Sequence, residues 1–250
     1  MPVRLSPYDT GGGTMTALGV SASTKAARKP PADLRRYSRW FLALLVPIGP
    51  AAIAVLRYVL PYLTVDDTDE IVRKVAADLQ TTSLVLWLGF VAVLTLVPGV
   101  IAVGRLTRRR APRITAAALL LLIPGYLALA WLIGSDLLLW TGAEAGLDQS
   151  TLVQLYNTTH MTTAIAAGVF VLGHVLGTVL LGVAMWHSGA VPRWAAVLTV
   201  VAQPLHFVAA VIVGSPSLDL VAWGMNAVGF AAVAVAVIRL PDDEWDLPPA

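Results

Sequence analysis

Long apolar runs separated by short polar segments dominate the pattern along the chain. Six such runs lie at about residues 40–63, 81–104, 114–140, 160–186, 193–214 and 218–239. Each run reaches the roughly 20 residues that a helix needs to cross about 30 Å of hydrocarbon. Backbone groups in lipid have to be hydrogen-bonded within the segment, so each run is expected to be helical. The pattern therefore predicts an all-α, polytopic membrane protein with six transmembrane helices.

Polar segments flank this transmembrane domain, which we place at residues 39–240. Residues 1–38 are basic, rich in Gly, Ser, Thr and Pro, and lack an apolar period, which predicts a disordered tail. Residues 241–250 are acidic and are expected to form a second disordered tail. The chain carries two candidate translation starts, Met1 and Met15, and the sequence does not decide between them.

Composition supports a membrane protein and argues against several functional classes. The chain is 57% hydrophobic and 13% charged, whereas soluble domains have about 45–50% apolar and about 25% charged residues. The absence of cysteine excludes disulfides and thiolate metal sites. No GxSxG, HExxH or glycine-rich phosphate loop is present in the spans, which favours a non-enzymatic role.

Charges in the connecting segments alternate along the chain. Basic residues gather in the N-terminal tail, in the second loop at Arg105–Arg113, and at Arg193, whereas the first, third and fifth loops are mainly acidic. By the positive-inside rule, both termini are cytoplasmic. The excess of Arg over Lys, together with abundant Ala and Val, indicates a bacterial source and hence the plasma (inner) membrane. The loop Arg105–Arg113 is juxtamembrane, so it favours contact with anionic lipid head groups and not with nucleic acid.

The first external loop contains a short amphipathic pattern. Ile71, Val72, Val75 and Ala76 recur at helical spacing within residues 66–80. This spacing predicts a short helix lying on the membrane surface.

Polar side chains occur at one depth in the last three spans. At about 1.5 Å per residue, His174 lies about 18 Å from the inner surface, and His206 and Asn226 lie about 20 Å from it. Gln203 follows at about 15 Å. Polar groups at this depth usually face a bundle interior and are candidates for function. They form either a hydrogen-bonded tie between helices or a binding site for a small molecule or cation. The metal, if any, is unknown.

Haem is a third interpretation of the same histidines. His174 and His206 on neighbouring helices could supply the two axial ligands of a single b-type haem. That cofactor would make the chain a membrane redox protein.

A second polar cluster lies nearer the outer surface. Arg57 interrupts the first span and Asp136 the third, and we expect a structural ion pair between them. The functional alternative is an outer vestibule that adds the side chains of His160, Tyr156, Thr158 and Thr159.

The fourth span contains a GxxxG match from Gly173 to Gly177, and His174 lies within it. Small residues at this spacing permit close helix approach. The match predicts intramolecular helix packing next to His174, with dimerisation as the alternative.

The last third of the chain resembles a family of small bacterial six-helix membrane proteins classed as a domain of unknown function. The resemblance covers residues 169–240 and rests on Gly173-His174-Val175, on Val191-Pro192-Arg193-Trp194, and on a sixth helix ending at Arg239. It implies the six-helix fold and no particular activity. The resulting hypothesis is a non-enzymatic binding, transport or accessory protein that contacts the lipid bilayer and a small-molecule ligand. The alternatives are a single-haem redox protein and a purely structural membrane partner. The oligomeric state stays open.

Overall fold

The computed structural model describes residues 32–246, and within this range all regular structure is helical. Six helices are long and apolar enough to cross a membrane, which confirms the all-α, six-span prediction. A π-helix, η1, continues α7 and completes the fifth span. The helices are α1 (Arg35–Val59), α2 (Thr68–Ala77), α3 (Leu79–Thr107), α4 (Pro112–Glu144), α5 (Gln149–Asn157), α6 (Met161–Ser188), α7 (Arg193–Phe207), η1 (Val208–Val213), α8 (Pro216–Arg239) and α9 (Asp242–Trp245).

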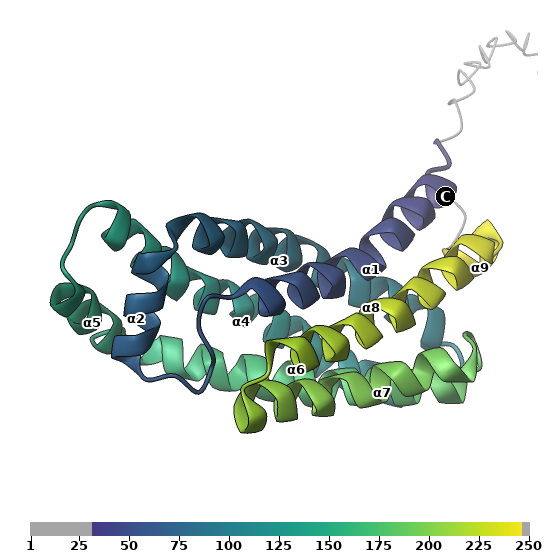
Figure 1. Cartoon of the computed structure of the whole chain (residues 1–250). Helices are drawn as coiled ribbons and strands as arrows, with labels where there is room; N and C mark the ends of the chain where they lie inside the picture. Colours follow the sequence, from purple (N-terminus) through teal and green to yellow (C-terminus); the bar gives the residue numbers. More distant parts are fainter. Residues whose placement is uncertain (1–31, 247–250) are drawn as a thin grey trace, which may run out of the picture. The chain divides into compact units, whose positions relative to one another are not determined.

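The six long helices run side by side along the molecule (Figure 1), and their contacts form a closed ring. Each packs against the next along the chain, in the order α1, α3, α4, α6, α7 and α8, and α8 packs against α1. Short connections explain this order, because consecutive elements joined by short loops are usually neighbours. The ring places α1 beside α8, so residues about 160 positions apart come into contact.

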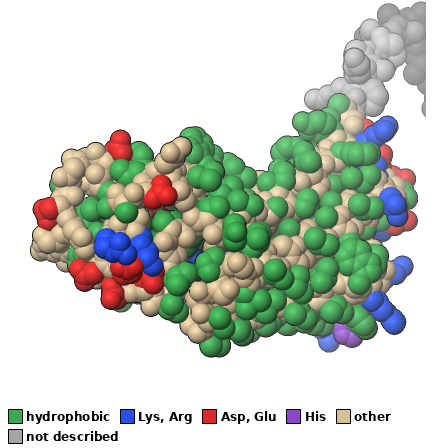
Figure 2. All heavy atoms as spheres, in the orientation of Figure 1, with side chains coloured by type: hydrophobic (Ala, Val, Ile, Leu, Met, Phe, Trp, Pro, Cys, Tyr) green, Lys and Arg blue, Asp and Glu red, His purple; other side chains and the backbone are tan. Residues whose placement is uncertain are grey.

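Hydrophobic side chains cover the middle of the molecule, and charged side chains gather at its two ends (Figure 2). Many large apolar side chains on the spanning helices are exposed, such as Trp87 at 67% and Leu120 at 75%. Such a belt is suited to contact with lipid and unsuited to water. The cytoplasmic location of the termini stays a prediction.

The short helices α2 and α5 pack together at one end of the ring (Figure 1). The predicted helix in the first external loop is present as α2, and Asp67 caps it by accepting a hydrogen bond from the backbone N–H of Glu70. Its apolar face is buried against α4 and α5, so α2 packs on the protein, and its position on the membrane surface stays a prediction. The buried cluster consists of Ile71, Val72, Val75, Leu139 and Leu152.

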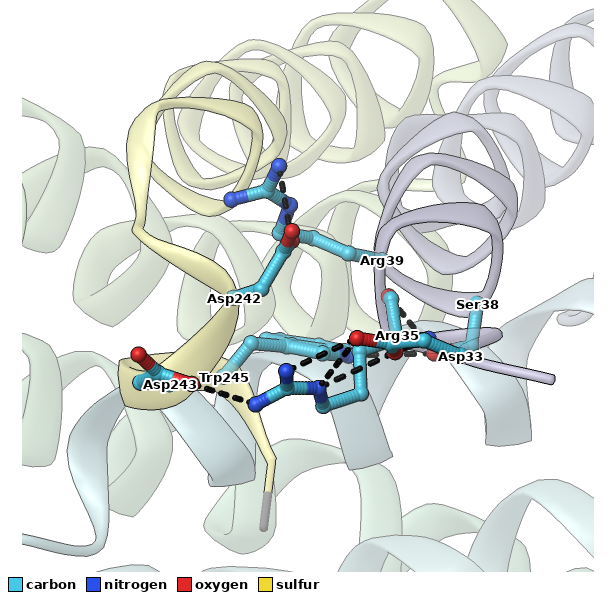
Figure 3. A network of polar contacts seen from close by, with 7 residues as sticks. All are labelled: Asp33, Arg35, Ser38, Arg39, Asp242, Asp243 and Trp245. Carbon is cyan, nitrogen blue, oxygen red and sulfur yellow. Dashed lines mark hydrogen bonds and ion pairs between the residues drawn. The ribbon is translucent and has the colours of Figure 1, made fainter. Parts of the chain in front are cut away.

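The C-terminal segment corrects one expectation. Residues 242–245 were predicted to be disordered, but they form α9 beside the first turns of α1 (Figure 3). Trp245 is 2% exposed and donates a hydrogen bond from Nε1 to Ser38 Oγ over 3.3 Å. Arg39 pairs with Asp242 at 3.1 Å. Helix α1 begins at Arg35, four residues before the predicted domain boundary. The predicted tail up to residue 31, and residues 247–250, lie outside the described residues.

This contact places the start of the first span and the end of the last span at the same end of the ring, as an even number of crossings requires. The segment that contains α9 also contacts the predicted lipid-binding loop, through Arg105. Arg105 lies 5.2 Å above the ring of Trp245 and pairs with Asp246 at 3.3 Å. Arg108, Arg109 and Arg113 of this loop are exposed, and their contact with anionic lipid head groups stays a prediction.

Changing Trp245 to Ala should release α9 from the ring. The substitution removes the buried indole, its hydrogen bond to Ser38 and its cation–π contact with Arg105. We expect faster hydrogen exchange in residues 35–39 and 240–246 and little change in the long helices, measured by mass spectrometry. Glu244→Ala is the matched control, since that side chain is exposed on the same short helix. Equal exchange in the two variants would contradict the contact.

Candidate ligand site between the spanning helices

A cavity of about 330 Å³ lies inside the ring and extends from the two buried histidines to the α2–α5 end. Side chains from five of the six spanning helices contribute to it, α3 being the exception. The volume falls at the lower end of the roughly 300–1,000 Å³ typical of small-molecule sites. Most of the wall is apolar, with Ile53, Leu56, Leu129, Phe170, Val175 and Trp223 among the lining residues.

His174 lies on α6 at the edge of this cavity. Its ring stacks on that of Phe170, with 4.2 Å between centroids, and its Nδ1 lies 2.5 Å from the backbone oxygen of Phe170. A carbonyl oxygen only accepts hydrogen bonds, so we assign the proton to Nδ1. Nε2 then carries a lone pair, and it is buried without a hydrogen-bond partner in the described part of the chain.

His206, near the end of α7, is the second imidazole at the cavity. Its Nδ1 lies 2.5 Å from Oδ1 of Asp219 on α8. The other carboxylate oxygen of Asp219 accepts a hydrogen bond from Arg57 Nε over 2.6 Å. An ionised carboxylate accepts hydrogen bonds, so His206 donates its Nδ1–H to Asp219, and this bond does not involve Nε2.

The Arg57–Asp219–His206 chain joins three helices, α1, α8 and α7. The side chain of Asp219 is 1% exposed and that of Arg57 is 19% exposed. A carboxylate buried this deeply needs a partner charge and hydrogen bonds to offset its lost hydration. Arg57 supplies the charge, and it donates a further hydrogen bond to Thr64 over 2.8 Å.

The two imidazoles lie side by side, with 5.3 Å between ring centroids and 55° between ring planes. Trp223 borders both, 6.0 Å from His174 and 5.4 Å from His206 between centroids. Its indole Nε1 is buried and has no hydrogen-bond partner among residues 32–246. Residues that line an apolar cavity therefore carry one buried acceptor and one buried donor without hydrogen-bond partners, Nε2 of His174 and Nε1 of Trp223.

Asn226 and Gln203 do not join these groups. Both side chains are fully buried, but neither lines the cavity, and their amide atoms form no hydrogen bond within the described range. The expected hydrogen-bonded tie among His174, His206 and Asn226 is not formed. His206 instead bonds to Asp219, since a hydrogen bond to a charged carboxylate is stronger than one to a neutral amide.

The outer polar cluster is also arranged differently from the prediction. Arg57 pairs with Asp219, so the expected Arg57–Asp136 ion pair is wrong. Asp136 accepts a hydrogen bond over 2.6 Å from the hydroxyl of Tyr62, in the connection between α1 and α2. Burial, and then the charge of Asp136, raise the pKa of the Tyr62 hydroxyl well above its ordinary value, which keeps this donor neutral.

The residues around His160 are divided between the cavity and the surface. Tyr156 on α5 lines the cavity, and burial raises the pKa of its hydroxyl. His160 is exposed and caps α6, where its Nδ1 accepts a hydrogen bond from the backbone N–H of Thr162. Thr158 and Thr159 donate to nearby backbone carbonyls. Only Tyr156 of this group reaches the site.

Asp219 was not among the predicted site residues, because it was counted with the acidic residues of the fifth loop although it falls within the sixth predicted span, residues 218–239. A usable signal was present in the preceding residues. Ser215 caps α8 by accepting a hydrogen bond from the backbone N–H of Leu218, and Pro216 occupies the first turn. Serine followed by proline is a typical helix start. It places Asp219 inside the helix, where its side chain can reach His206 across the α7–α8 connection.

The two histidines do not fit the axial positions of a haem. Axial ligands lie on opposite faces of a flat macrocycle, which needs open space on all sides between the two rings. Here Trp223 borders both imidazoles, and Phe170 stacks on His174.

Comparison with protein-family models, with curated proteins and with solved structures finds no match to this chain. The resemblance over residues 169–240 accordingly stays a prediction, and the function has to be inferred from the site.

Proposed function

We propose that the protein is a non-enzymatic binding or transport protein of the bacterial plasma membrane, whose ligand is a small, mainly apolar molecule carrying a hydroxyl group. The supporting observation is the set of unpartnered polar atoms at the cavity. Nε2 of His174 is a buried acceptor without a partner, and Nε1 of Trp223 is a buried donor without one. With the termini cytoplasmic, the α2–α5 end of the cavity faces the outside.

A hydroxyl group matches this set because it donates one hydrogen bond and accepts others. It can donate to an imidazole Nε2 and accept from an indole N–H. The rest of such a ligand has to be apolar, since leucine, isoleucine and aromatic side chains form most of the cavity wall. Burying a more polar molecule there would leave its groups unpaired at a cost of about 1–3 kcal/mol each. A purely structural role would not explain why these histidine and tryptophan nitrogens line a cavity without hydrogen-bond partners.

The proposal predicts a preference for 4-fluorophenol over 4-fluoroanisole, a probe of similar shape without the donor. The full chain in lipid nanodiscs would be titrated with each probe and followed by ¹⁹F NMR, with empty nanodiscs as the correction for partition into lipid. One hydrogen bond contributes about 1 kcal/mol, so the phenol should bind about fivefold more tightly. His174→Phe should abolish this preference while keeping a ring of similar size.

His160→Gln is the matched control, because His160 is exposed and lies outside the cavity. It should retain the preference for the phenol. Equal binding of both probes to the unmodified protein, or a preference unchanged in His174→Phe, would contradict the proposal.

A further inference from the structure

The hydrogen bonds at Nδ1 of the two buried histidines have a consequence beyond hydroxyl binding. Each imidazole donates Nδ1–H to an oxygen, in one case the Phe170 carbonyl and in the other the Asp219 carboxylate. In metal-binding histidines, the ring nitrogen that does not bind the metal characteristically donates its N–H to a carbonyl or carboxylate oxygen, which fixes the tautomer and raises the basicity of the ligand. Both histidines here have that arrangement, and neither of these hydrogen bonds involves Nε2.

We propose that His174 and His206 together bind one first-row transition-metal ion of the Zn²⁺ type through their Nε2 atoms. This inference concerns the same imidazoles as the proposed function but a different class of ligand, and it goes beyond that function. Imidazole suits Zn²⁺, Co²⁺, Cu²⁺ and Ni²⁺, whereas Mg²⁺ and Ca²⁺ prefer oxygen ligands.

The separation of the rings agrees with a shared ion. With Zn–N bonds of about 2.0–2.1 Å and tetrahedral angles, the centres of two imidazoles on one ion lie about 5 Å apart. The observed separation is 5.3 Å. The planes are tilted by 55°, which lets two rings converge on one point without stacking.

Both histidines line the cavity, which has room for further ligands of the ion. No group of three or more His, Cys, Asp or Glu residues suited to a metal occurs between residues 32 and 246, so the chain supplies two ligands. Open positions of this kind are filled by water, an anion or a bound molecule. Because Arg57 already balances the charge of Asp219, Asp219 does not neutralise the metal ion. An anion such as chloride, bound as a further ligand, would offset the charge of the ion. A hydroxyl compound in the cavity would then compete with the ion for Nε2.

The test uses the full chain purified without a polyhistidine tag, stripped of metal and placed in nanodiscs. We expect one equivalent of Co²⁺ to bind with the visible absorption of a tetrahedral ion, and Zn²⁺ to displace it. His174→Phe and His206→Phe should each lower the Co²⁺ affinity at least tenfold. His174→Phe is decisive if the other variant misfolds, since Nδ1 of His174 bonds only within its own helix. The double variant His160→Gln/His187→Gln should bind like the unmodified chain.

Several results would overturn the metal site. These are no Co²⁺ binding by the unmodified chain, unchanged binding in His174→Phe, or loss of binding in the surface double variant. The tests of the two proposals are independent, so either proposal can be wrong without the other. Phenol preference without Co²⁺ binding leaves the proposed function standing and ends the metal site, and Co²⁺ binding without phenol preference does the reverse.

Discussion

Changing Asp219 to Asn is expected to lower the free energy of unfolding by about 3–5 kcal/mol, the usual cost of breaking a buried ion pair by removing one partner. The substitution keeps the size of the side chain but removes the charge opposite Arg57 and weakens the bond to His206. Arg57 would then keep its hydrogen bond to Thr64 but lose its partner charge. Unfolding in detergent, followed by circular dichroism, measures the change.

Two further variants make this prediction specific. Replacing both charges, as in Arg57→Met/Asp219→Leu, should recover most of the lost stability, because a buried ion pair exchanged for apolar residues of similar volume is often neutral. Asp69→Asn is the matched control, since Asp69 is exposed on α2 and should change stability by less than about 0.5 kcal/mol. A loss in Asp219→Asn no larger than in Asp69→Asn would show that the pair does not hold the helices together.

Changing Gly173 to Val is expected to cost about 3 kcal/mol, at the upper end of overpacking penalties. A Cβ at Gly173 would lie 2.6 Å from the carbonyl oxygen of Leu121 and 2.8 Å from Cα of Gly125. Both atoms belong to the backbone of α4, so they cannot move aside without separating α4 from α6. The same displacement would shift His174, and the phenol preference should decline together with the stability.

Gly168→Val provides the control on the same helix. A Cβ there meets nothing within 4 Å, so the substitution should be nearly neutral or slightly stabilising. Unfolding midpoints of the two variants, measured side by side in one detergent, separate close packing from helix propensity. Similar midpoints would mean that the close contact at Gly173 is not essential.

The helix contacts could be predicted because they depend on patterns within single segments. The GxxxG match in the fourth span predicted intramolecular packing next to His174, and the approach of Gly173 to Leu121 and Gly125 confirms it. The short connections before α7 and α8 likewise favour α6, α7 and α8 as neighbours in order, and this order is observed. Both inferences use local spacing and loop length, which a sequence contains directly.

The partners of the charged residues could not be predicted in the same way. Two acidic residues, Asp136 and Asp219, lie near the depth of Arg57 and could form an ion pair with it. Which of them does so depends on which helix lies beside α1. The closing contact of the ring is between α1 and α8, so Asp219 is near and Asp136 binds Tyr62 instead. Similarly, Trp245 is buried only because α9 reaches the start of α1 and Arg105 of α3.

Six apolar helices and their order along the chain follow from the amino-acid sequence alone, because hydrophobic length is a property of each segment. The tertiary structure decided that His174 and His206 border one cavity, that Asp219 orients His206, and that Asn226 and Gln203 lie outside the site. These outcomes depend on the rotation of each helix about its axis and on the closure of the ring. Packing between distant segments sets both.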